Sequence, residues 1–236
     1  MGLFDAQARS VLAFLADKRA RKELIELAPR AGWPEAPSLV LEEDTALELG
    51  HPLQGSLAFI VWTSDPGIVG DGIDLVGPDV DAISQARAPL AQIVMVSGEF
   101  GEEYECYREL KDAVYGVKLT GVMARAMPSR QSFWYRVSRE ARARGFSLAH
   151  LGAALLQKLK AVKFVRSARI VFVTSGKPDL EALTAPARET GRIAGALNKM
   201  YEEMNYDCAE CEYSDVCAEA IELKKIRERM VKRSAT

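Results

Sequence analysis

The sequence has few cysteines and histidines, and it has no long apolar run. It contains 4 cysteines and 2 histidines in 236 residues. The longest strongly apolar runs, residues 57–62 and 170–173, are far shorter than the ~20 residues of a membrane-spanning helix. The segment after Met1 becomes charged before residue 20, so we expect no signal peptide there. We therefore expect a cytoplasmic protein that does not bind membranes, in a reducing setting where clustered cysteines are metal ligands or redox groups more often than disulfides.

An excess of charge of one sign is also missing. The formal net charge is -2, and the isoelectric point is about 5.9. This balance gives no reason to expect nucleic acid as a partner. Hydrophobic residues make up 48% of the chain and charged residues 27%, which excludes a disordered chain, a collagen and a coiled-coil rod. The length predicts one domain, or one domain with a small appendage.

Hydrophobic periodicity predicts helices and strands that alternate unevenly. Helices are expected over residues 3–28, 101–120, 147–160, 178–201 and 218–232, and strands over residues 56–63, 73–76, 90–96, 132–138 and 168–174. This order predicts an α+β fold, in which helices pack on a mixed sheet. We divide the chain into an N-terminal helix and linker (1–36), a central α/β domain (37–204), and a cysteine segment with a terminal helix (205–236) as a C-terminal helical extension.

Three cysteines lie close together near the end of the sequence. Cys208, Cys211 and Cys217 follow the spacing C-x2-C-x5-C. Thiolates at such spacing suit zinc or an iron–sulfur cluster. A structural zinc ion usually takes four protein ligands, so three local cysteines favour a [4Fe–4S] cluster, with zinc as the alternative. The fourth iron then takes Cys106, a carboxylate, a second chain or an exogenous ligand, although a lone cysteine on an apolar helical face is usually a core residue.

A second segment combines arginines with aromatic residues. Its arginines are Arg125, Arg130, Arg136, Arg139, Arg142 and Arg144. Guanidinium groups match phosphate geometry, and aromatic faces stack on a purine. In a strand, Trp134 and Arg136 point to the same side. The pattern suits a nucleotide-like ligand such as coenzyme A, or an acidic partner such as a ferredoxin. The alternative is a core strand beside a solvated basic helix.

These motifs occur within a longer stretch that resembles the central domain of acetyl-CoA synthase, the β subunit of the carbon monoxide dehydrogenase/acetyl-CoA synthase complex. The resemblance covers residues 47–183. It rests on short pieces in the order of that family: Leu-Glu-Leu-Gly at 47–50, Ile-Asp-Leu-Val-Gly-Pro-Asp-Val at 73–80, Pro-Leu-Ala-Gln-Ile-Val-Met-Val at 89–96, Gly-Val-Met at 121–123, Trp-Tyr-Arg-Val-Ser at 134–138 and Ile-Val-Phe-Val-Thr at 170–174.

The resemblance implies an arginine-rich α+β domain that interacts with coenzyme A and ferredoxin. It implicates Trp134 and Arg136, and also Arg130, in binding coenzyme A. The three late cysteines match the first cysteines of the family's [4Fe–4S] site in type and order. The sequence departs from the family because no fourth cluster cysteine and no later Cys-x-Cys pair follow Cys217. We therefore expect a shortened relative rather than a complete acetyl-CoA synthase.

Three functions are consistent with these features. The first is an iron–sulfur protein with an electron-transfer or accessory role in anaerobic one-carbon or acyl-CoA metabolism, docking on a redox protein or a larger enzyme complex. The second is an enzyme whose open cluster site acts on a CoA-linked or one-carbon substrate. The third is a non-catalytic interaction subunit stapled by zinc.

Overall fold

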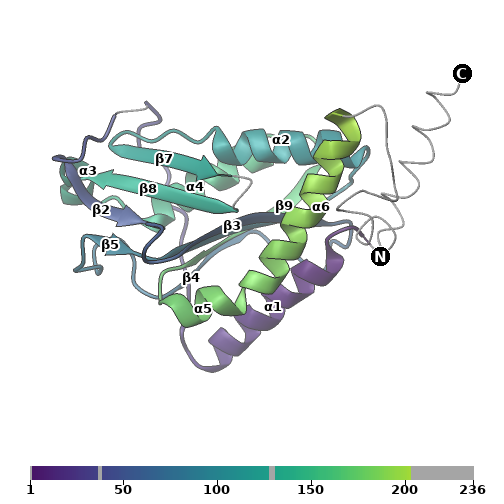
Figure 1. Cartoon of the computed structure of the whole chain (residues 1–236), viewed down its shortest axis with the longest axis horizontal. Coiled ribbons are helices and arrows are strands. Elements are labelled where there is room, and N and C mark those ends of the chain that lie inside the picture. The colour runs from purple at the N-terminus through teal and green to yellow at the C-terminus, as the bar shows by residue number, and fades with distance from the viewer. Residues whose placement is uncertain (1, 37–38, 128–130, 203–236) are drawn as a thin grey trace, which may run out of the picture.

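The computed structural model describes residues 2–36, 39–127 and 131–202 (Figure 1). Within these residues the chain forms two β-sheets with helices packed around them. The predicted α+β fold with a mixed sheet is therefore confirmed. The predicted cysteine segment and terminal helix lie outside the described residues.

The larger sheet is five-stranded and mixed. It is built from β1 (Leu24–Glu26), β3 (Ser56–Thr63), β4 (Gly72–Val76), β6 (Leu90–Gly98) and β9 (Val165–Val173), in the order β1-β4-β9-β6-β3. β3 pairs parallel with β6, and β4 pairs parallel with β9. β9 and β6 are antiparallel, as are β1 and β4. Every residue of β6 is buried, as expected for a strand whose two faces are both covered.

Helices cover this sheet. α1 (Asp5–Ala20) and α6 (Thr184–Glu202) lie beside each other against β3, in front of the sheet in Figure 1. α4 (Leu148–Lys160) packs against β9 and β4, and also contacts α2 (Glu103–Tyr115). Two short helices, α3 (Arg139–Ala143) and α5 (Lys177–Ala182), follow β8 and β9. No helix in the described part of the chain has the length and apolar character to cross a membrane.

The smaller sheet has four strands. It comprises β2 (Thr45–Leu49), β5 (Arg87–Ala88), β7 (Val122–Met127) and β8 (Ser132–Ser138), in the order β5-β2-β8-β7. The inner face of β8 carries the buried residues Phe133, Tyr135 and Val137. The Tyr135 hydroxyl donates a hydrogen bond to Gln92 of β6 at 2.6 Å, which places this face against the larger sheet. The Ala58 backbone also donates to the Gln131 carbonyl at 2.6 Å. A single apolar core therefore fills the space between the sheets.

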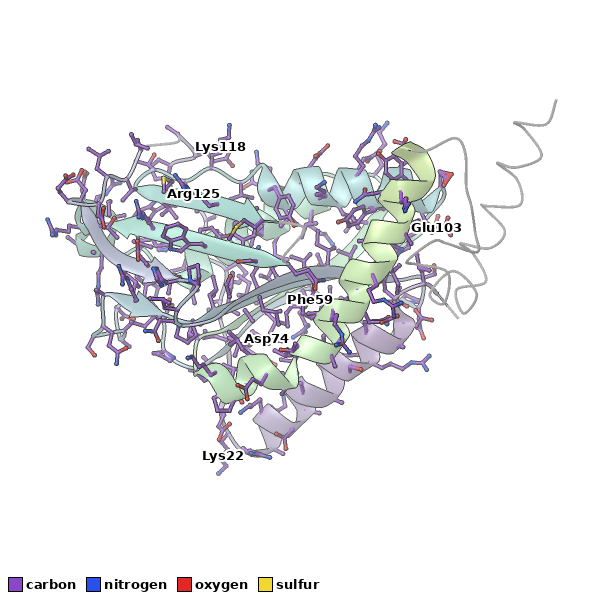
Figure 2. The ribbon with its side chains drawn as sticks, in the orientation of Figure 1. Lys22, Phe59, Asp74, Glu103, Lys118 and Arg125 are labelled. Carbon is purple, nitrogen blue, oxygen red and sulfur yellow. The ribbon has the colours of Figure 1, made fainter. Side chains whose placement is uncertain are left out.

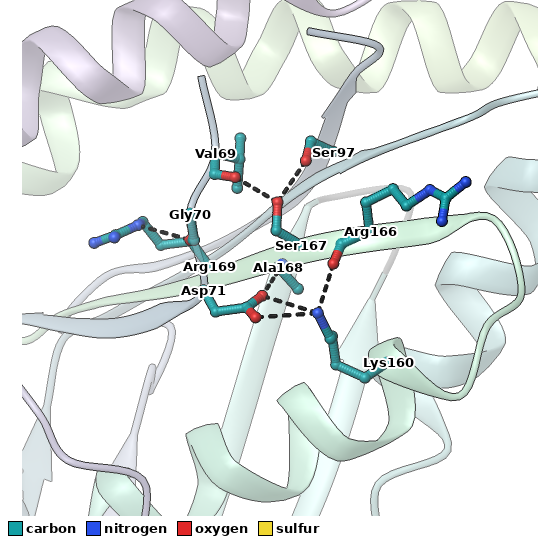
Figure 3. A network of polar contacts seen from close by, with 9 residues as sticks. All are labelled: Val69, Gly70, Asp71, Ser97, Lys160, Arg166, Ser167, Ala168 and Arg169. Carbon is teal, nitrogen blue, oxygen red and sulfur yellow. Dashed lines mark hydrogen bonds and ion pairs between the residues drawn. The ribbon is translucent and has the colours of Figure 1, made fainter. Parts of the chain in front are cut away.

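A polar network fixes the start of β9 (Figure 3). The Lys160 ammonium, at the end of α4, donates to both carboxylate oxygens of Asp71 at 3.3 and 3.0 Å. The backbone N–H of Ala168 donates to the same carboxylate at 2.8 Å. Ser167 bonds to Ser97 of β6 and to the Val69 carbonyl. These contacts tie α4, β6, β9 and the turn before β4 together.

The structure differs from the sequence expectations at several elements. The helix predicted over residues 3–28 ends at Ala20, because Lys22 has a φ of +60° and Leu24–Glu26 pair with β4. The helix predicted over residues 101–120 ends at Tyr115, followed by Gly116. A separate short helix, α5, precedes α6 where one helix was predicted. Four strands, β1, β2, β5 and β7, were not predicted.

Candidate functional site

Strand alternation divides β8 into an inner and an outer face. Phe133, Tyr135 and Val137 are buried, whereas Trp134 and Arg136 are partly exposed on the opposite side. The Arg136 guanidinium carbon lies 4.8 Å from the centroid of the Trp134 ring, which is within cation–π range. The smaller sheet thus presents an aromatic ring and a guanidinium group together on its outer face.

A carboxylate lies at the centre of this face. The strand register places Glu48 of β2 opposite Arg136 of β8 on one side and Arg87 of β5 on the other. Arg136 Nε donates to Glu48 Oε1 at 2.9 Å, and Arg87 Nε donates to Glu48 Oε2 at 3.0 Å. The Glu48 side chain is 8% exposed. A buried carboxylate is stable there because two cations compensate its charge.

Two further residues flank the aromatic ring. Arg125 of β7, labelled in Figure 2, is the register partner of Trp134, and its guanidinium carbon lies 5.8 Å from the ring centroid. The His51 ring meets Trp134 edge-on at 5.8 Å, and His51 Nε2 lies 3.7 Å from Glu48 Oε2. Trp134 Nε1 is buried without a hydrogen-bond partner among the described residues. A buried N–H of this kind is costly unless a group outside the described residues accepts its bond.

These groups, called the outer-face cluster below, are Glu48, His51, Arg87, Arg125, Trp134 and Arg136. The cluster contains three guanidinium groups and one carboxylate, of which Arg87 and Arg136 contact the carboxylate, so it carries an excess of positive charge at neutral pH. Guanidinium groups bind phosphate and carboxylate groups through paired N–H donors, and the indole ring offers a stacking surface. The arrangement can therefore hold an anionic ligand with a planar ring.

The other predicted site residues are not brought into this cluster. Arg130, Cys208, Cys211 and Cys217 lie outside the described residues. Cys106 is buried on α2 and 5% exposed. Burial, aided by the nearby carboxylates of Glu109, Glu103 and Glu102, raises the pKa of its thiol. The described residues hold no group of three or more His, Cys, Asp or Glu side chains placed to bind a metal ion.

Sequence reasoning missed three members of the cluster, Glu48, His51 and Arg87. Glu48 is 39 positions from Arg87 and 88 positions from Arg136, whereas His51, in the loop after β2, is three positions from Glu48. No local pattern joins Glu48 to the two arginines, because these contacts depend on the register of strands that were not predicted. The Leu-Glu-Leu-Gly piece at 47–50, which includes Glu48, was the one available signal.

A cavity of about 250 Å³ opens at one end of the smaller sheet. Its lining includes Asp44, Ser138, Arg139, Glu140 and Arg144. The two carboxylates balance the two guanidinium groups, so the cavity has no net charge to select an anion. None of the residues of the outer-face cluster lines this cavity.

Comparisons with known proteins show which family and which relatives the sequence resembles. Residues 38–178 match the family described as CO dehydrogenase/acetyl-CoA synthase complex beta subunit. The chain is 25% identical over 148 residues to the acetyl-CoA decarbonylase/synthase complex subunit beta 2 of Methanocaldococcus jannaschii, covering 60% of this chain and 31% of that protein. It is 32% identical over 120 residues to the corresponding subunit beta of Methanopyrus kandleri, covering 50% of this chain and 25% of that protein.

The matched region is thus a minor part of each relative. It nevertheless spans most of the described domain, from the segment before β2 to the start of α5. It includes every residue of the outer-face cluster. The chain therefore belongs to the CO dehydrogenase/acetyl-CoA synthase complex beta subunit family.

Proposed function

We propose that the outer-face cluster binds a CoA-type ligand, with a ring of the ligand against Trp134 and its phosphates on the arginines. The observation that carries the proposal is the position of the Arg136 guanidinium, 4.8 Å from the Trp134 ring centroid and bonded to Glu48. This geometry keeps a cation beside a stacking surface, which is what a ligand with a purine and phosphates requires. Arg130 belongs to the same proposal on the sequence pattern alone.

The residues present fit such a ligand. The donor set is rich in guanidinium groups, and Trp134 Nε1 is a buried donor without a partner among the described residues. Coenzyme A supplies a thiol that carries acyl groups. The contribution of this chain is to bind the nucleotide end of the ligand and to fix its orientation.

The relatives are named as subunits of an acetyl-CoA decarbonylase/synthase complex. We propose that this chain likewise acts in anaerobic one-carbon or acyl-CoA metabolism, in an accessory or electron-transfer role within a larger enzyme complex. Cys208, Cys211 and Cys217 would hold a [4Fe–4S] cluster, and the basic face would also suit an acidic redox partner such as a ferredoxin.

Calorimetric titration with coenzyme A tests the ligand proposal. Trp134→Ala and Arg136→Ala should each weaken binding on the order of 10-fold, since each removes a stacking or charge-assisted contact. Arg166→Ala is the matched control, because Arg166 pairs with Glu99 in an exposed ion pair away from the cluster. Absence of coenzyme A binding by the wild type, or equal affinities in all variants, would contradict the proposal.

Anaerobic purification with iron, zinc and sulfide analysis tests the cluster proposal. A [4Fe–4S] protein should show a broad visible absorption that dithionite bleaches. A colourless protein with stoichiometric zinc would instead support the zinc-stapled interaction subunit.

One observation favours an enzyme with an open cluster site as the second candidate. The Cys106 side chain is buried on α2 and 5% exposed, so its thiol is covered by the packing of the domain rather than open to a cluster. With three cysteine ligands, one iron stays available to a CoA-linked or one-carbon substrate. Cys106→Ala should then retain the cluster, and loss of the cluster in this variant would indicate a closed site with four cysteine ligands.

A further inference from the structure

The two arginines bonded to Glu48 use only part of their hydrogen-bonding capacity. Arg87 and Arg136 each donate to the carboxylate through Nε. Within the described part of the chain, their terminal nitrogens donate no hydrogen bond. A guanidinium group has five N–H donors in a rigid plane, so a hydrogen bond at Nε restricts the directions of the remaining four.

The strand register makes this arrangement specific. Glu48 lies between its register partners, Arg136 on β8 and Arg87 on β5. Each oxygen of the Glu48 carboxylate accepts a hydrogen bond from one guanidinium group. The Glu48 side chain is 8% exposed, whereas the Arg87 side chain is 48% exposed. The carboxylate is therefore covered, and the guanidinium group of Arg87 remains accessible to solvent.

We propose that Glu48 is a positioning residue that orients Arg87 and Arg136 as a two-arginine receptor for a phosphate monoester or diphosphate group. Held by Nε, the guanidinium groups keep their terminal N–H donors for the anion, and His51 lies at the edge of the same site, 3.7 Å from the carboxylate. The inference deepens the proposed function and rests on it for the source of the phosphate, which is either coenzyme A or a free phosphate compound.

A purely electrostatic role for Glu48 predicts the opposite change in anion affinity. If its charge merely neutralises the arginines, Glu48→Gln removes a negative charge and anions should bind more tightly. If it positions them, the glutamine amide offers one acceptor oxygen for two Nε donors, so one arginine is released and anions bind more weakly. Glu48→Asp separates the two effects further, because it keeps the charge but shortens the side chain by one methylene group.

The test is calorimetric titration of the whole chain with inorganic pyrophosphate, followed by coenzyme A. Glu48→Gln, Glu48→Asp and Arg87→Lys should each weaken pyrophosphate binding on the order of 10-fold, the size of one charge-assisted hydrogen bond. Arg87→Lys retains the charge but lacks both Nε and the paired terminal donors. Glu140→Gln is the charge-matched control, since Glu140 is 81% exposed on α3, and its affinity should stay within about twofold of the wild type.

Equal or tighter pyrophosphate binding by Glu48→Gln, or wild-type affinity in Glu48→Asp, would overturn the positioning role. Urea unfolding of each variant separates weak binding from loss of the fold. If the Glu48 variants do not fold, Arg87→Lys decides, because Arg87 is exposed at a short edge strand; wild-type affinity there refutes the receptor. The arginine Nε–H resonances provide a readout beyond affinity, since Glu48→Gln should shift one of them toward the position of a solvated guanidinium group.

The two proposals fail in different ways. Binding of pyrophosphate that depends on Glu48 and Arg87, without binding of coenzyme A, supports the receptor and contradicts the proposed ligand. Binding of coenzyme A that depends on Trp134 but not on Glu48 or Arg87 does the reverse. A wild-type chain that binds neither compound overturns both.

Discussion

The pair formed by Asp74 and Arg169 offers a sharp test of how charge is accommodated in the larger sheet. Asp74 lies within β4 and its side chain is 0% exposed (Figure 2). Its Oδ2 accepts a hydrogen bond from Arg169 of β9 at 2.8 Å, whereas its Oδ1 has no partner among the described residues. The Arg169 side chain is 20% exposed, so the compensation of the Asp74 charge depends on one guanidinium group.

Arg169→Met keeps the aliphatic packing and removes that compensation. A buried carboxylate left without its cation should cost about 3–5 kcal/mol of unfolding free energy at pH 7. Asp74→Asn removes the charge and keeps the shape, so its cost should be smaller, about 1–3 kcal/mol. Once Asp74 is neutral, Arg169→Met has no charge to expose. The double variant should therefore be more stable than the sum of the two single losses predicts, by about 2 kcal/mol.

Urea unfolding followed by fluorescence and far-ultraviolet circular dichroism measures the four free energies. Arg166→Met, on the same strand, is the control because Arg166 and Glu99 are 65% and 79% exposed, and an exposed pair contributes about 0–1 kcal/mol. A loss below about 1 kcal/mol for Arg169→Met, or additive losses in the double variant, would refute the argument from burial.

Two further predictions concern α5 and a turn. Burial alone would raise the pKa of Asp179, but the hydrogen bonds that Lys18 and Ser175 donate to its carboxylate outweigh burial and lower that pKa. The hydrogen bonds that the Lys18 ammonium donates to Asp179 and Glu23 raise the pKa of Lys18. Asp179→Asn should therefore lower the free energy of unfolding by about 2 kcal/mol at pH 7, measured by urea unfolding. This loss should fade as the pH falls below 3.8, where Asp179 becomes protonated, or rises above 10.5, where Lys18 becomes neutral. A loss that stays constant across this pH range would contradict the ion pair. Gly77 has a φ of +108° and an added Cβ would lie 2.4 Å from the Ser175 nitrogen, so Gly77→Ala should lose about 2–4 kcal/mol, while Gly101→Ala, with open space around it, serves as the control.

Several of the strands that the sequence predicts have a composition that reflects burial on both faces. β3, β6 and the second half of β9 are dense in β-branched and aromatic residues. β7 reads Val-Met-Ala-Arg-Ala-Met, which has little strand preference, because an edge strand with an exposed side does not need an apolar composition. β1 was absorbed into a predicted helix, since its strand state depends on pairing with β4 about fifty positions later.

The candidate site was likewise predicted only in part. The outward pair of Trp134 and Arg136 was predicted from the two-residue period of a strand, and the structure places both side chains together. The carboxylate between the arginines was not predicted, because it reaches Arg136 only through the register of β2 against β8. A local pattern gives the direction of a side chain, whereas the identity of its neighbours across a sheet depends on the tertiary fold. The predictions for Cys208, Cys211 and Cys217 remain predictions.

The position of β9 has a consequence for the order of folding. β9 is the last strand of the larger sheet along the chain, yet it lies between β4 and β6 in the middle of the sheet. Its partners Gly72 and Ala91 pair with Arg169 and Val173, so both ladders have a high contact order. A nascent chain therefore cannot close this sheet before residue 173 has left the ribosome, and until then β4 and β6 expose unpaired edges. We expect folding to be slow and late in synthesis, limited by topology rather than by local propensity.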